Sequence, residues 1–183
     1  DFDSHAPEHA RFDLLGIDYL VSWKMGLVTR EGLPIQAETL YHGQAPSGEA
    51  KVYRLPTQAQ RAWLPEEVLH PPSKQVLWEL MSAEGFNARQ TALLLPPAQE
   101  MDTSPGHVTV LSDRPGRIEL QVQNEQPALL VVSEAWYPGW VATTPTSRAP
   151  TELVSGYMQG VHLPQRGPQR VLLEYQPAVL RWG

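Results

Sequence analysis

Cysteine is absent from this sequence, which excludes disulfide bonds, thiolate metal ligands and a cysteine nucleophile. No stretch reaches the roughly 20 apolar residues that a membrane-spanning helix needs, so we expect the chain as given to be soluble. Lysine and arginine are scattered singly, and the net charge is −6. A nucleic-acid-binding protein normally has a clustered basic face, so nucleic acid is not an expected partner.

Long helical patterns are also scarce, whereas proline is abundant, with 18 among 183 residues. Proline removes a backbone hydrogen-bond donor and fixes φ, which argues against long helices and favours short strands joined by turns. Hydrophobic residues make up 42% of the chain, enough for a real core. We therefore predict a mainly β, α+β fold.

The C-terminal part, residues 101–183, has the pattern of an antiparallel β-sandwich or jelly roll. Short apolar runs alternate there with turn signals such as the Pro-Gly pairs at 115–116 and 138–139. Regular spacing of this kind is typical of sandwiches. Strands are expected at 107–112, 117–124, 128–134, 139–143, 152–154, 158–163 and 169–175.

The preceding part, residues 1–100, is predicted to be a small mixed α/β part. Its one clear helix lies near 73–84, with Ser73 as N-cap, Gly85 as the stop, and Val76, Leu77, Leu80 and Met81 on one face. Short strands are expected at 17–22, 50–55, 62–64, 67–69 and 91–95, with a turn or helix at 11–16 and a loop at 43–48. The proline-containing stretch 96–106 is the expected boundary, although both parts could form one continuous domain.

Motifs for known catalytic chemistry are missing. The sequence has no Gly-x-Ser-x-Gly turn, no phosphate-binding loop and no His-Glu-x-x-His helix. His5 and His9 have helical spacing, but Pro7 lies between them. Glu66 and Glu67 would face opposite sides of a strand. We therefore expect no catalytic residue, metal site or cofactor in this chain, with a hydrolase that pairs distant carboxylates as an alternative.

Aromatic residues are concentrated in the segment 133–140, which follows an apolar strand. It contains Glu134, Trp136, Tyr137 and Trp140 around a Pro-Gly turn. One interpretation is a carbohydrate-binding platform, in which the rings cover the apolar faces of sugars and Glu134 accepts hydrogen bonds from hydroxyls. The other is core packing, the commoner role of aromatic residues at such a corner.

The last residues suggest a membrane nearby. Tyr175 and Trp182 are of the types that favour membrane–water interfaces, and residues 177–183 become increasingly apolar. This pattern predicts that a transmembrane helix begins here in the natural protein. A native C-terminus is the alternative.

Several blocks of the sequence also resemble the bacterial YfhO-type family of multi-spanning membrane proteins, which are related to C-type glycosyltransferases. The longest is Leu-Leu-Val-Val-Ser-Glu-Ala-Trp-Tyr-Pro-Gly-Trp at 129–140. The others occur in the family's order, at 14–21, 52–56 with 61–63, 159–164 and 171–177. The stretch 141–150 departs from the family pattern because it lacks an Asp-Gly hairpin.

The resemblance implies a non-catalytic accessory domain on the extracytoplasmic face of the bacterial cytoplasmic membrane. Its partners would be its own transmembrane module and a cell-envelope glycan or lipid-linked sugar. The family's catalytic acids lie in loops that have no counterpart here, so glycosyltransferase activity would belong to the parent protein. A free-standing secreted β-sandwich that acts in adhesion or carbohydrate binding is the alternative.

Overall fold

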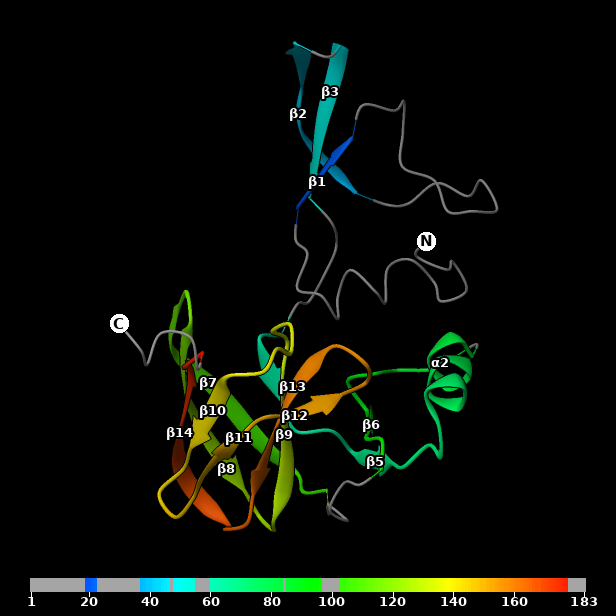
Figure 1. Cartoon of the computed structure of the whole chain (residues 1–183). Coiled ribbons are helices and arrows are strands. Elements are labelled where there is room, and N and C mark those ends of the chain that lie inside the picture. Colours follow the sequence, from blue (N-terminus) through cyan, green and yellow to red (C-terminus); the bar gives the residue numbers. More distant parts are fainter. Residues whose placement is uncertain are drawn as a thin grey trace. The chain divides into compact units, whose positions relative to one another are not determined.

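The computed structural model describes residues 19–22, 37–46, 48–54, 60–83, 85–96 and 103–177. The chain divides into two compact units, one formed by residues 1–60 with 82–84 and the other by 61–81 with 85–183 (Figure 1). The fold is mainly β with antiparallel sheets and a single α-helix in the described part, which confirms the predicted α+β class. The expected element at 11–16, His5, His9 and Trp182 all lie outside the described residues.

The first unit contains a three-stranded antiparallel sheet in the order β1-β3-β2. Its strands are β1 (Tyr19–Ser22), β2 (Glu38–Ala45) and β3 (Gly48–Arg54). The loop expected at 43–48 is wrong, because β2 continues to Ala45 and the turn to β3 is tight. Gly43 is a strand residue whose missing side chain leaves room for the Tyr41 ring, which a Cβ atom would strike.

The second unit is built around a sandwich of two antiparallel sheets. One has the order β11-β10-β14-β8-β7 and the other the order β12-β13-β9-β4. The five-stranded sheet contains β7 (Gly106–Arg114), β8 (Arg117–Asn124), β10 (Trp140–Thr143), β11 (Arg148–Pro150) and β14 (Gly167–Tyr175). The four-stranded sheet contains β4 (Ala62–Trp63), β9 (Ala128–Val132), β12 (Glu152–Val154) and β13 (Met158–Leu163).

The core lies between these two sheets, and both contribute to it. Along β8 the side chains alternate, so that Ile118, Leu120 and Val122 are fully buried while the residues between them face outward. Trp140 of β10 belongs to the same core. The remaining buried members are Ala62, Leu130, Val132, Ala142, Val161, Leu163, Val171 and Leu173.

A βαβ segment precedes β7 in the chain. It consists of β5 (Glu67–Leu69), α2 (Lys74–Ser82) and β6 (Thr91–Leu93), with β5 and β6 parallel. The predicted helix is confirmed: the Val76 N–H donates to Ser73 Oγ at 3.3 Å, and Gly85 has a φ of +80° after the helix end. A helical connection is what a parallel strand pair requires.

This segment joins the four-stranded sheet at its β12 edge. Leu94 of the segment forms a bridge with Val154, the Ser155 N–H donates to the Leu93 carbonyl at 2.8 Å, and the Leu93 N–H donates to Ser155 Oγ at 3.2 Å. All five residues of β9, further inside the same sheet, are buried on both faces of the strand. Double burial explains why this strand is continuously apolar in sequence rather than alternating.

The division expected at residue 101 falls inside the second unit. Strand β4, far upstream of that point, pairs with β9 through Ala62↔Val132 and Trp63↔Val131. The sandwich therefore includes residues from both sides of the expected boundary. A two-residue strand carries too little periodicity for its pairing to be read from sequence.

Two adjacent leucines on β14 provide a test of the sandwich. Leu173 is fully buried between the sheets, whereas Leu172 faces the opposite side and is half-buried. We expect Leu173→Ala to lower the free energy of unfolding by about 2–5 kcal/mol and Leu172→Ala by clearly less, because only the former leaves a core cavity. Urea unfolding followed by far-UV circular dichroism would measure both; equal losses would contradict the assigned faces.

Candidate functional site

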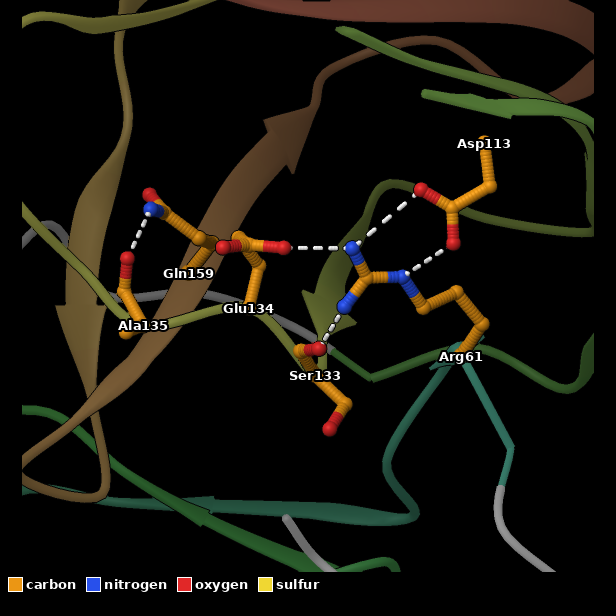
Figure 2. Close-up of polar contacts among 6 residues, drawn as sticks. All are labelled: Arg61, Asp113, Ser133, Glu134, Ala135 and Gln159. Carbon is orange, nitrogen blue, oxygen red and sulfur yellow. Dashed lines mark hydrogen bonds and ion pairs between the residues drawn. The ribbon is translucent and has the colours of Figure 1, made fainter. Parts of the chain in front are cut away.

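The aromatic segment 133–140 connects β9 of one sheet to β10 of the other. Backbone hydrogen bonds hold its first half: the Ser133 N–H donates to the Arg61 carbonyl at 2.9 Å, and the Trp136 N–H donates to the Tyr157 carbonyl at 2.8 Å. Between them, Nε2 of the fully buried Gln159 donates to the Ala135 carbonyl at 2.9 Å (Figure 2). The stretch 133–136 is therefore fixed against the sandwich.

Arg61, immediately before β4, ties this segment to β7. Its Nε donates to Asp113 Oδ2 at 2.8 Å and its Nη2 to Asp113 Oδ1 at 3.3 Å. The same guanidinium also donates to a Glu134 carboxylate oxygen and to the Ser133 carbonyl (Figure 2). One side chain thus connects the start of β4, the end of β9 and the tip of the β7–β8 hairpin.

The charges around Arg61 stabilise its protonated form. Burial by itself disfavours the charge, but the hydrogen bonds and negative charges of Glu134 and Asp113 outweigh it and raise the pKa of Arg61. Glu134, expected from the sequence as a hydrogen-bond acceptor for sugar hydroxyls, directs a carboxylate oxygen at Arg61.

The three aromatic residues predicted for the site lie in different environments. Trp140 is 7% exposed and belongs to the sandwich core, as the packing interpretation expects for that residue. Trp136 is half-buried, and its Nε1–H donates to the Thr151 carbonyl at 3.0 Å. Tyr137 is 63% exposed. These rings are neighbours in the sequence, but in the structure Trp140 faces the core and Tyr137 faces solvent.

Tyr175 is brought to this site from the far end of β14, which sequence reasoning did not foresee. Its ring lies 6.3 Å from that of Tyr137 in an edge-to-face arrangement and 5.7 Å from that of Trp140 (centroid distances). It is 37% exposed. The signal that could have found it is the register of β10 and β14, which pairs Trp140 with Tyr175.

The Pro-Gly turn at 138–139 leaves space for the Tyr175 ring to approach the backbone. Gly139 has a φ of +111°, a conformation that side-chain-bearing residues rarely adopt. A Cβ atom there would lie 3.2 Å from a ring carbon of Tyr175. The turn glycine therefore serves both the backbone conformation and the close approach of the ring. The result is a cluster in which Trp140 lies beneath, and Tyr175 and Tyr137 face solvent.

Within the described ranges, no group of three or more histidine, aspartate or glutamate residues is arranged to hold a metal ion. No helix in that part of the chain is long and apolar enough to cross a membrane. No protein-family model, curated protein or solved structure matches the chain.

The contribution of Arg61 to stability can be measured against a surface arginine. Arg170 pairs with Glu119 at 3.1 Å, but its side chain is mostly exposed. We expect Arg61→Ala to lower the free energy of unfolding by about 2 kcal/mol, because it removes bonds to Asp113, Glu134 and Ser133 together. Arg170→Ala is expected to cost less than about 1 kcal/mol. Thermal and urea unfolding would compare the two.

The pH dependence of the stability lost in Arg61→Ala is a further test. A raised pKa means that the Arg61 contribution is fully present below the unfolded-state pKa and is lost only in strongly alkaline solution. The difference in free energy of unfolding between the parent protein and Arg61→Ala should thus stay constant from about pH 6 to pH 9. If Arg61→Ala lowered the free energy of unfolding by no more than Arg170→Ala does, the role of Arg61 in connecting the strands would be contradicted.

Proposed function

We propose that this chain is a non-catalytic accessory domain that contacts cell-envelope glycans on the extracytoplasmic face of a bacterial cytoplasmic membrane. It would belong to a multi-spanning protein that resembles the lipid-linked-sugar glycosyltransferases, with its own transmembrane module as partner. The observation that carries the glycan contact is the solvent-facing pair of rings, Tyr137 and Tyr175, above buried Trp140. The ordered sequence blocks at 14–21, 52–56 with 61–63, 129–140, 159–164 and 171–177 support the membrane context.

The chemistry of the ring pair suits a sugar. The C–H face of a pyranose lies flat against an aromatic ring, while its hydroxyl groups need hydrogen-bond partners at the ring edge. Tyrosine offers both a flat face and a hydroxyl group. Next to Tyr175, Gln176 Oε1 accepts a hydrogen bond from Arg148 Nη2 at 2.8 Å, which places further polar groups nearby.

The rings are also held in place before any ligand arrives. Trp140 is fixed in the core and contacts Tyr175 from the buried side, and Tyr175 in turn contacts Tyr137. A preorganised ring loses little conformational entropy when it binds, so a small surface can still provide useful affinity. Glu134 and Asp113 direct oxygens at Arg61, which supports a structural rather than an acid–base role for both.

Native gel electrophoresis through soluble polysaccharides tests the glycan contact. We expect glycol chitin or hydroxyethylcellulose in the gel to retard the parent protein. Tyr137→Ala should weaken binding about tenfold, because it removes the most exposed ring of the pair. Tyr19→Ala is the matched control, since Tyr19 is similarly exposed, at 54%, but lies on β1 of the other unit.

Stability measurements separate loss of contact from loss of folding. Tyr137→Ala should change the free energy of unfolding by no more than about 0.5 kcal/mol, as is usual for an exposed residue. The glycan proposal fails if neither polymer retards the parent protein. It also fails if Tyr137→Ala is retarded as strongly as Tyr19→Ala.

The membrane context is tested separately, by reading the coding sequence on both sides of this segment. We expect it to encode transmembrane helices that flank the domain. A secretion signal upstream with a stop codon directly downstream would favour a free-standing secreted adhesion or carbohydrate-binding protein instead. That outcome would overturn the membrane anchoring and leave the ring pair as the binding surface.

A further inference from the structure

We propose that the site takes an extended glycan chain rather than a single sugar, along a row of aromatic side chains that ends at Trp78 on α2. This inference rests on the proposed glycan contact and concerns the size of the ligand. The row begins with Tyr175 and Tyr137 and continues through Trp136. Trp78 is its far end, and it is 51% exposed although it is a large apolar side chain.

Trp78 is supported from below by the turn between β12 and β13. A Cβ atom at Gly156 would lie 3.1 Å from Cη2 and 3.3 Å from Cζ2 of Trp78, so one edge of the indole ring rests on this glycine. Ser155 and Gly156 have φ values of +48° and +78°, and the Tyr157 N–H donates to the Val154 carbonyl at 3.2 Å. This is the backbone of a tight hairpin turn with little freedom.

The turn is itself anchored. Ser155 is fully buried, and it exchanges hydrogen bonds of 2.8 and 3.2 Å with the backbone of Leu93 on β6. Leu77, next to Trp78 on the helix, is 2% exposed and also comes within 3.5 Å of where a Gly156 side chain would begin. Trp78 is thus an exposed ring on a rigid support, as Tyr175 is above Trp140.

A backbone hydrogen bond links the two ends of the row. The carbonyl of Tyr157, the residue after Gly156, accepts the Trp136 N–H at 2.8 Å, and Tyr137 follows Trp136 in the chain. The Trp136 indole is oriented by its bond to the Thr151 carbonyl at 3.0 Å. Figure 1 shows the end of β14, the loop after β9, the β12–β13 hairpin and α2 following one another along one end of the second unit.

The character of the exposed side chains favours a glycan as the occupant. In the described part of this unit, the exposed large apolar residues are Trp78, Tyr137, Tyr175, Val110 and Leu111. The three along the row are aromatic, whereas the two aliphatic ones lie on β7. A protein interface core is usually one continuous apolar patch. Rings separated by backbone and polar groups suit a polymer that repeats flat C–H faces between hydroxyl groups.

The dependence of binding affinity on the length of the oligosaccharide tests the inference. The probes are oligosaccharides of β-1,4-linked N-acetylglucosamine and of β-1,4-linked glucose, with one, three or six units, and the readout is isothermal titration calorimetry. We expect the hexamer of at least one series to bind the full chain more than about tenfold tighter than the trimer. The reason is that a ligand held at Tyr137 reaches the Trp78 end at a high effective concentration.

Variants at Trp78 separate stacking from structural support. Trp78→Leu keeps an apolar side chain over Gly156 but removes the flat ring. It should therefore abolish the gain in affinity from trimer to hexamer, and it should leave the affinity for the trimer unchanged. Trp78→Phe restores a ring and should recover part of the gain. Leu111→Ala, an exposed apolar residue on β7, is the control and should change neither affinity.

The outcomes distinguish this inference from the proposal beneath it. If the trimer binds in a Tyr137-dependent way but the hexamer binds no tighter, the extended row is wrong and the glycan contact stands. The same conclusion follows if Trp78→Leu retains the full gain. If no oligosaccharide of either series binds and neither polymer retards the protein, both are overturned.

Discussion

The strand β9 carries apolar side chains on both of its faces, and each face needs its own cover. The five-stranded sheet covers one face and encloses the core with Leu130 and Val132. Leu129 and Val131, on the other face, are fully buried as well. The β5–α2–β6 segment joins the same sheet at its β12 edge, through the contacts of Leu93 and Leu94 with the β12–β13 hairpin. The sandwich and the βαβ segment are therefore parts of one compact unit.

This layering decides what the aromatic segment after β9 can do. The segment has to cross from one sheet to the other at the end of the sandwich, and Arg61 holds its start by contacts with Ser133 and Glu134. Because Arg61 also binds Asp113, the crossing is tied to the five-stranded sheet. Glu134 thus has a structural task in this crossing.

Some aromatic rings of the segment pack in the core, and others lie on the surface. Trp140 starts β10 and faces the core, so the alternation of the strand buries it. Tyr137 lies before the turn, outside the alternation, and faces solvent beside Tyr175. The buried ring supports the exposed ones, and Trp78 rests on the β12–β13 turn in a comparable way. The interpretations of packing and of sugar contact therefore apply to different residues of the same segment.

Local signals in the sequence determined the elements whose patterns are complete within them. The helix at 74–82 has its cap at Ser73 and its stop at Gly85, and β8 and β14 show their buried faces by alternation. The structure alone decided that β2 runs through Gly43, that β4 pairs with β9, and that Tyr175 joins Tyr137. Each of these depends on which strand lies beside which, and in what register. Such pairings are set by the total burial of distant segments rather than by any short pattern. For that reason the sequence contained the aromatic residues of the site, but only the fold determined which of them face water.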